Sequence, residues 1–425
     1  MRIKYISICI SILLISATVM SGCMPAVKPY VSAPESADTA NSESGTATGQ
    51  TTVDIPRAYE ADYYKFYDDI IINSLTDGGF KVMSPVNIYT CMSLVAGTAG
   101  DTAQKELTDA LGASDEEDLR AKTKAVIGSF YKDMEFIKIL PGNSIWLDNG
   151  FDTKQECIDK LKSDYGAYIG KGSFTDGEYL SEMKKWLSEK TGGLLDEDIN
   201  IEVGENDRAM LLSTLYMSAR WENGFYYDTS DKTLFNDTAS CTYMKCTEDG
   251  CVYTGEDFTA YKKDLLNYQG AMWLFLPNED KTVYDVINGR PVEYIFSEQK
   301  KAKTNLEVHL TVPKFDVKSN KSMNEALQAC GITDIFKYGS ASDFSPLSDE
   351  PLFISGVAHG ARVKVDNEGM EAAAYTGVTY AAECADPAEE PEKYYFNVYR
   401  TFLFIITDSN NVPLFAGVVG DAEVE

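Results

Sequence analysis

The spacing of apolar and polar residues along the chain predicts helices early and strands late. Apolar side chains recur every three or four positions, as in helices with one buried face, over residues 58–75, 153–165, 182–195 and 322–330. A further helical run follows residues 83–88 and reaches Leu111, just before Gly112. Short runs typical of strands cover residues 143–147, 210–217, 271–276, 306–312, 401–407 and 414–419. Segregated runs of this kind favour an α+β fold with a large mixed or antiparallel sheet.

One segment, between the strand-like runs 361–365 and 399–407, has the pattern of a strand in the position of a loop. From Met370 to Ala382 every second residue is uncharged, whereas the other parity contains Glu371 and Glu383. A period of two with one uncharged face is what a half-buried strand needs. After Glu383 the chain is acidic and contains two prolines, which is typical of an exposed loop. The segment therefore predicts a strand that runs directly into a cleavable loop.

The first 22 residues have the pattern of an export signal. Arg2 and Lys4 precede an apolar run over residues 5–20, which is shorter than the roughly 20 residues of a membrane-spanning helix. The run ends in Met-Ser-Gly-Cys, which resembles the bacterial lipobox, so we expect a lipid on Cys23. The alternative is an ordinary secretory signal followed by a coincidental cysteine.

Three parts of the chain follow from this pattern. Residues 1–22 are expected to form a lipoprotein signal peptide, and residues 23–55, rich in Ser, Thr, Ala, Pro and Gly, a flexible tether. Residues 56–425 are expected to form one folded domain. The expected location is the outer face of a bacterial cell membrane, held only through the lipid, or the surrounding medium.

Composition limits the kinds of molecule that the protein is expected to bind. The 425 residues carry a formal net charge of −28, which argues against nucleic acid because phosphate binding needs clustered Lys and Arg. The hydrophobic fraction of 44% is ample for a large core. Cys241, Cys246 and Cys251 form no CxxC pair and have no nearby His, so we expect no zinc site and no other metal or cofactor. A disulfide among these three stays open. We expect a monomer.

The sequence contains few residues and no recognised motifs that would support enzymatic catalysis. Beyond the signal the chain has only His309 and His359, and it lacks GxSxG, HExxH, P-loop and GxGxxG motifs. His309 shares the polar parity of its strand with Glu307 and Thr311, so it is predicted to face outward. We therefore expect no catalytic residues and no enzymatic activity.

Several motifs in a fixed order carry a resemblance to a known family. They are SPVNIYTCMSLVAGTAGDTAQKELTDALG, KKWLSEKTGG, LLSTLYMSARWENGF, MWLFLPNED, VHLTVPKFDV, GITDIF, VAHGARVKVDNEGMEAAAYT, TFLFIITD and PLFAGVV. Together they resemble the serpins over residues 58–420. The resemblance implies the serpin fold, with a large central sheet, further sheets, about eight to nine helices and an exposed reactive-centre loop.

The resemblance also implies a function for the strand-like segment. In inhibitory serpins a protease cuts the loop, and the released strand inserts into the main sheet and carries the acylated protease with it. The expected partner is a serine, or alternatively a cysteine, endopeptidase. The alternative function is a non-inhibitory surface binding protein that uses the serpin fold and whose loop is only a protease substrate.

Counting along the family pattern assigns the loop. The hinge corresponds to Gly369, Met370, Glu371, Ala372, Ala373, Ala374 and Thr376. The scissile bond lies fourteen residues after the hinge glycine, which here is Glu383–Cys384, with Tyr380, Ala382 and Cys384 as the other choices for the bait residue. A glutamate bait calls for a glutamate-preferring serine protease with a basic specificity pocket.

The loop and the shutter of the main sheet both differ from the usual serpin pattern. The loop has Met370 where Thr or Ser is usual, and a long acidic return over residues 385–392. The shutter of the main sheet corresponds to Ser84, Asn87, Ser213 and His359, in which Ser and Asn have exchanged two positions. We expect the exchanged groups to remain hydrogen-bonded. Trp221 corresponds to the tryptophan of the breach, where the loop first inserts.

Overall fold

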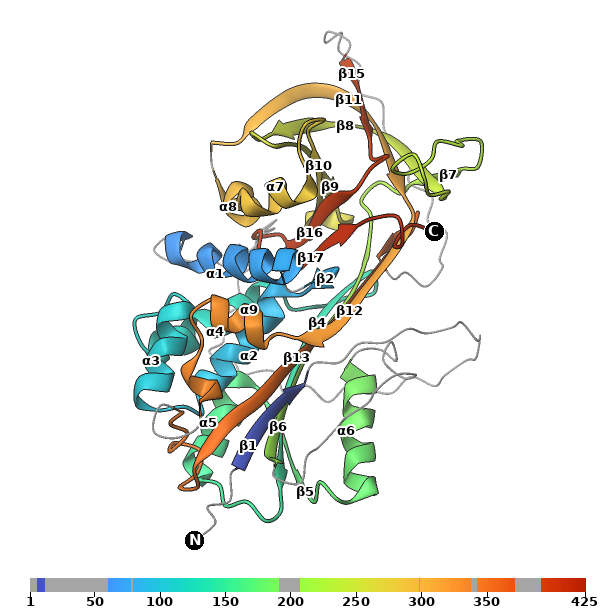
Figure 1. Ribbon diagram of the computed structural model, residues 1–425. Coiled ribbons are helices and arrows are strands. Elements are labelled where there is room, and N and C mark those ends of the chain that lie inside the picture. Colours follow the sequence, from blue (N-terminus) through green and yellow to red (C-terminus); the bar gives the residue numbers. More distant parts are fainter. Residues whose placement is uncertain are drawn as a thin grey trace, which may run out of the picture.

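Two β-sheets form the framework of the computed structural model, which describes residues 6–11, 60–77, 79–190, 207–297, 299–337, 342–370 and 391–425 (Figure 1). The main sheet contains β1 (Ile6–Ser11), β3 (Lys132–Asp133), β4 (Ile137–Asp148), β5 (Tyr168–Gly172), β6 (Asp207–Arg220), β12 (Phe315–Ser322), β13 (Leu352–Val365) and β14 (Gly369–Met370). The second sheet contains β2 (Val82–Met83), β7 (Tyr226–Asp228), β8 (Tyr243–Thr254), β9 (Phe258–Asp264), β10 (Gly270–Pro277), β11 (Lys301–Pro313), β15 (Glu392–Asn397), β16 (Phe402–Asp408) and β17 (Pro413–Val419).

The described residues form nine α-helices around these sheets. They are α1 (Glu60–Ile72), α2 (Pro85–Ala96), α3 (Asp101–Ala110), α4 (Glu116–Phe130), α5 (Gln155–Tyr165), α6 (Gly177–Lys190), α7 (Val283–Asn288), α8 (Pro291–Phe296) and α9 (Asn324–Ala329). Strands of both directions occur in each sheet, so the predicted α+β class with a large mixed sheet is confirmed. In the described part of the chain, no helix is both long and apolar enough to cross a membrane.

The middle of the main sheet is open between two of its long strands. Among the described residues, β6 and β13 do not pair directly with each other; instead other segments lie between them. At one end β14 pairs antiparallel with both strands. At the other end β1 pairs parallel with both strands (Figure 1). Strand β1 belongs to the apolar run of the predicted signal peptide, and the rest of that peptide, Cys23 and the tether lie outside the described residues.

Two cores cover the two faces of the main sheet. The larger core includes the wholly buried helix α2. Helix α6 covers the other face over β4 and β6, and it closes a separate aromatic core with Trp146 at its centre. The Trp146 ring contacts Tyr179 and Trp186 of α6 edge-on, with centroid distances of 5.6 and 6.4 Å.

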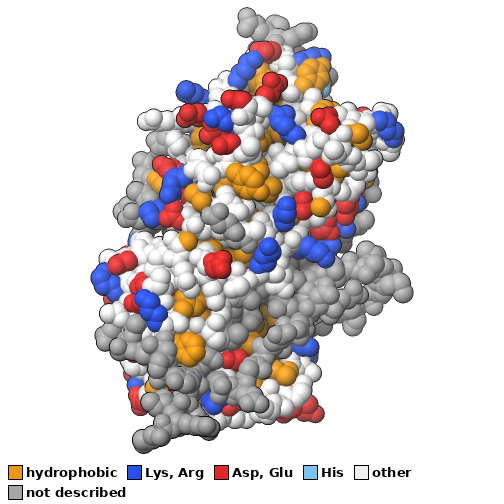
Figure 2. Space-filling model, in the orientation of Figure 1, with side chains coloured by type: hydrophobic (Ala, Val, Ile, Leu, Met, Phe, Trp, Pro, Cys, Tyr) orange, Lys and Arg blue, Asp and Glu red, His pale blue; other side chains and the backbone are white. Residues whose placement is uncertain are grey.

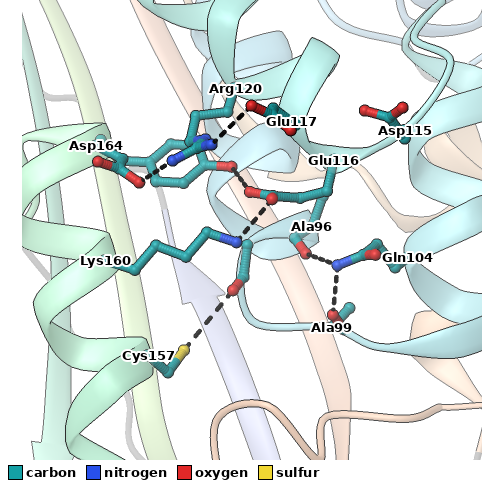
Figure 3. A network of polar contacts seen from close by, with 12 residues as sticks. Ala96, Ala99, Gln104, Asp115, Glu116, Glu117, Arg120, Cys157, Lys160 and Asp164 are labelled. Carbon is teal, nitrogen blue, oxygen red and sulfur yellow. Dashed lines mark hydrogen bonds and ion pairs between the residues drawn. The ribbon is translucent and has the colours of Figure 1, made fainter.

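Polar contacts join the helices α4 and α5 (Figure 3). Glu116, in the first turn of α4, accepts hydrogen bonds from the Tyr165 hydroxyl at 2.9 Å and from Lys160 Nζ at 2.7 Å. Arg120, one turn later, pairs with Asp164 of α5. Acidic residues in the first turn of α4 also interact favourably with the positive end of the helix dipole. This cluster stabilises the layer that supports α2.

The structure corrects some predicted boundaries. The helix expected over residues 182–195 begins at Gly177 and ends at Lys190 in the described range. Its first turn is fixed by Asp176, whose carboxylate accepts the Glu178 N–H at 2.9 Å, a signal that apolar spacing does not contain. The helical run that reaches Leu111 is divided into α2 and α3 by residues 97–100.

The surface mixes charges of both signs. On the face shown in Figure 2, basic side chains are scattered among acidic ones rather than gathered into one patch. The predicted outward orientation of His309 is confirmed: its side chain is 30% exposed, whereas Leu306, Val308 and Leu310 of the same strand are at most 1% exposed.

Candidate functional site

The predicted hinge begins as a strand already inside the main sheet. Gly369 pairs with Arg220 of β6, and Met370 pairs with Ala219 of β6 and Val365 of β13. A methyl group added to Gly369 would lie 2.2 Å from the Ala219 carbonyl oxygen, so only glycine fits this approach. The Met370 side chain is 3% exposed and packs into the larger core. Met370 thus lies on the buried side of the sheet opening.

A tight turn over residues 366–369 delivers the hinge to this position. Trp221, the residue after β6, holds this turn: its indole Nε1–H donates to the Asp366 carbonyl oxygen at 3.0 Å, and its backbone N–H donates to the Glu368 carbonyl oxygen at 3.1 Å. The Phe225 N–H donates to the Asn367 carbonyl oxygen at 2.9 Å. Trp221 and Phe225 are both buried and contact each other edge-on at 5.6 Å. The predicted breach tryptophan therefore touches the residues that lead into the hinge.

A second cluster lies halfway along the opening. Ser213 of β6 donates its hydroxyl hydrogen to Asn87 Oδ1 of α2 at 2.6 Å, and Asn87 Nδ2 donates to the Ser213 carbonyl oxygen at 3.3 Å. The same hydroxyl lies 2.7 Å from Asn143 Oδ1, so its single hydrogen faces two amide acceptors. Ser213 is fully buried and Asn87 is 4% exposed. The exchanged serine and asparagine are thus in direct contact.

His359 joins this cluster through a different partner than expected. Its Nε2 accepts the backbone N–H of Ser84 at 2.9 Å, and Ser84 Oγ in turn accepts the Asn87 N–H at 3.4 Å. His359 therefore reaches Asn87 through Ser84 and does not bond Asn87 or Ser213 directly. The reason is the N-cap of α2, where the first N–H groups lack helical partners and the ring nitrogen supplies an acceptor.

Burial determines the charge of His359. The ring is fully buried, and desolvation lowers its pKa from 6.5 to about 3. The ring is therefore neutral, with Nε2 as the acceptor and Nδ1 carrying the hydrogen. No described residue bonds to Nδ1. The ring stacks obliquely against Phe80 with a centroid distance of 6.2 Å.

Asn143 and Asp366 are the two residues of this site that sequence reasoning missed. Asn143 contacts Ser213 only because β4 and β6 pair in one register, and nothing in the local pattern marks it. Asp366 shares the turn with the hinge and could have been noted, because Asp followed by Asn-Glu-Gly is typical of a turn.

The remaining predicted residues of the loop lie outside the described range. These are Glu371, Ala372, Ala373, Ala374, Thr376, Tyr380, Ala382, Glu383 and Cys384, together with the lipidation residue Cys23. Their assignments, and the roles of the hinge, shutter and breach residues, stay predictions.

Six of the described cysteines carry free thiols. They are Cys91, Cys157, Cys241, Cys246, Cys251 and Cys330. Burial raises the pKa of Cys91 and Cys330 to about 12, which disfavours the reactive thiolate. No group of three His, Cys, Asp or Glu residues in the described range could hold a metal ion.

The main sheet thus has an opening between β6 and β13, with β14 at one end of it and β1 at the other. Residues 71–422 match the family model described as serpin (serine protease inhibitor). The chain therefore belongs to the serpin family, whose members are generally protease inhibitors rather than enzymes.

Individual relatives agree with this assignment. The chain is 24% identical over 373 residues to Serpin-Z10 of Arabidopsis thaliana, which covers 83% of this chain and 94% of the relative. It is 27% identical over 370 residues to Iripin-2 of Ixodes ricinus, covering 81% and 89%. Among solved structures, the native state of the thermophilic serpin Tengpin matches with a TM-score of 0.72 and 26% identity, covering 86% of this chain and 94% of that chain. The serpin fold is thus confirmed.

Proposed function

We propose that this serpin is a suicide-type inhibitor of serine endopeptidases. The cut loop would enter the main sheet between β6 and β13 and carry the acylated protease with it, in the place of β1, which would leave with the predicted signal peptide. The observation that supports this most directly is β14: the hinge already pairs with both strands, in the antiparallel direction that an inserted loop would continue. Strand addition of this kind uses main-chain hydrogen bonds on both sides of the new strand.

The bait residue of our proposal is Glu383, and the partner is a serine protease that prefers glutamate. A carboxylate that is buried in a specificity pocket needs a cationic or hydrogen-bonding partner there. The position is counted from Gly369, the first residue of the proposed hinge, which pairs with Arg220 of β6. Mass spectrometry of the peptide released on cleavage identifies the bond and separates Glu383 from Tyr380, Ala382 and Cys384.

The deciding experiment is incubation of the protein with a glutamate-specific serine protease, followed by a denaturing gel. A covalent complex that survives the detergent supports the inhibitor. Complete cleavage without a complex, and without a rise in thermal stability, supports the alternative of a surface binding protein whose loop is only a substrate. The long acidic return over residues 385–392 is the feature that favours this alternative.

We further propose that a lipid on Cys23 anchors the chain at the outer surface of a bacterial cell membrane and that the chain is monomeric. The sequence Met-Ser-Gly-Cys after an apolar run supports the anchor. Metabolic labelling with a radioactive fatty acid tests it, since the Cys23→Ala variant should lose the label and appear in the medium or accumulate with its signal uncut.

A further inference from the structure

One residue, Asp366, supplies most of the polar contacts of the turn before the hinge. The Asp366 carboxylate oxygen Oδ1 accepts the backbone N–H groups of Glu368 at 2.9 Å and Gly369 at 3.1 Å. The Asp366 N–H donates to the Gly369 carbonyl oxygen at 3.0 Å. Its own carbonyl oxygen accepts the indole N–H of Trp221 at 3.0 Å. The carboxylate, the backbone N–H and the backbone carbonyl of Asp366 therefore all form hydrogen bonds that fix the turn over residues 366–369.

This turn decides where the hinge lies. Residue 365 ends β13, and the chain must reverse within residues 366–368 so that Met370 pairs back onto Val365. The reversal also places Gly369 against the Ala219 carbonyl oxygen, where a side chain has no room. If the Gly369 N–H lost its acceptor, the chain could leave this approach and take Met370 out of the core. The carboxylate of Asp366 is the acceptor.

We propose that Asp366 is a positioning residue for loop insertion: it holds Gly369 and Met370 between β6 and β13 before the loop is cut. Insertion then starts from an existing strand nucleus. The first residues of an added strand lose conformational freedom before later pairing compensates for that loss, so a nucleus that is already ordered removes the slowest part of the process. The consequence for inhibition rests on the proposed function; the resting position of the hinge does not.

Three variants, with a fourth in reserve, separate the effect of geometry from the effect of charge. Asp366→Ala removes the acceptor, whereas Asp366→Asn keeps an oxygen at the same position and loses only the charge. Glu368→Ala is the matched control: it removes one acidic side chain from the same turn, and Glu368 contributes only backbone groups to the bonds described above. Asp366→Glu keeps the charge and displaces the oxygen by one methylene. It takes the place of Asp366→Ala if that variant does not fold.

Hydrogen exchange measured by mass spectrometry on the uncut full-length protein tests the resting position. A peptide that spans residues 366–370 should exchange about tenfold faster in Asp366→Ala, since two hydrogen bonds to backbone N–H groups are lost. Asp366→Asn and Glu368→Ala should stay within about twofold of the unmodified protein. Strand β10, in the second sheet, is the internal reference and should exchange equally in all variants. Equal hinge exchange in Asp366→Ala and Glu368→Ala would overturn the proposal.

The number of inhibitor molecules consumed per protease inactivated tests the consequence. With a glutamate-specific serine protease, Asp366→Ala should need at least about twice as many molecules, because slower insertion gives the acyl-enzyme more time to hydrolyse. The rate of loop cleavage and the value for Asp366→Asn should be unchanged. If hydrogen exchange at the hinge is faster in Asp366→Ala but the number of inhibitor molecules consumed per protease is unchanged, the role of Asp366 in insertion is overturned. If no variant and no unmodified protein forms a complex, the inhibitor function fails while the exchange result still decides where the hinge rests.

Discussion

The Ser213 hydroxyl and the Asn87 side chain, 126 residues apart in the sequence, bond to each other at 2.6 Å beneath the opening of the main sheet. The bond joins β6, one wall of the opening, to the buried helix α2. His359 joins β13, the other wall, to the N-terminus of the same helix through Ser84. Helix α2 is therefore connected to both strands between which a loop would enter.

Removal of the Ser213 hydroxyl should destabilise the protein. Ser213→Ala leaves Asn87 Oδ1 buried without its donor and also removes the contact with Asn143, so we expect a loss of about 1–3 kcal/mol in the free energy of unfolding. Urea denaturation at neutral pH measures it. The control is Ser163→Ala, at an exposed serine of α5, where the change should stay within about 0.5 kcal/mol. Similar values for both variants would show that the buried contact contributes nothing.

His359 should make stability depend on pH in one direction. The folded-state pKa is about 3 and the unfolded value is 6.5, so between these values the unfolded chain binds a proton that the folded chain does not. Stability is thus fully present above pH 6.5 and falls as the pH decreases, by about 1.4 kcal/mol per pH unit from this residue. At pH 5.0 the loss should be about 2 kcal/mol relative to pH 7.5.

The variant His359→Gln isolates this contribution. Its amide oxygen can accept the Ser84 N–H, and glutamine does not titrate. The difference in unfolding free energy between pH 7.5 and pH 5.0, measured by urea denaturation, should therefore be about 2 kcal/mol smaller in the variant. Comparison within each protein cancels any direct cost of the substitution. An identical pH difference in both proteins would contradict a neutral buried ring.

Some features of the fold and of this site could be predicted from the sequence, because patterns within short segments determine them. Alternation of side chains predicted the outward face of His309, and the order of motifs predicted the serpin fold with its strands and helices. The exchange of serine and asparagine predicted a contact, because two groups of complementary hydrogen-bonding type occupy each other's places.

Other parts depend on contacts between distant segments. The bond between His359 and Ser84 requires the N-cap of α2 to lie against β13, 275 residues away in the chain, and no local pattern specifies that approach. The contact of Asn143 with Ser213 depends on the register of β4 against β6. The start of α6 was predicted five residues too late, because an aspartate side chain rather than apolar spacing begins that helix.

The two faces of the hinge should tolerate charge differently. Ala372 has the parity of Met370, whose side chain is buried at the start of the opening, whereas Ala373 has the parity of Glu371. A carboxylate at position 372 would have to enter the core during insertion, at a cost of several kcal/mol. Ala372→Glu should therefore reduce the yield of covalent protease complex at least about tenfold and turn the protein into a substrate.

Ala373→Glu is the control for this pair, with the same substitution one residue further along. Its side chain should face away from the core, so the complex yield on a denaturing gel should stay near that of the unmodified protein. Both variants should be cleaved at equal rates, because neither residue lies at the scissile bond. Equal loss of complex in both would contradict the assigned parity.

A buried ion pair behind the turn offers the last test. Lys263 is 1% exposed and donates to Glu248 Oε2 at 2.6 Å. Its Nζ also lies 4.9 Å from the centre of the Phe225 ring. The backbone N–H of Phe225 in turn donates to the Asn367 carbonyl oxygen in the turn before the hinge. Lys263→Met should cost about 3–5 kcal/mol in the free energy of unfolding, because it leaves the Glu248 carboxylate without its cation. The double variant with Glu248→Gln should recover much of this loss, since the amide still accepts from Tyr261 and carries no charge. Urea denaturation of the four proteins gives the coupling energy. Additive losses would show that the lysine acts through packing against Phe225 instead of through its charge.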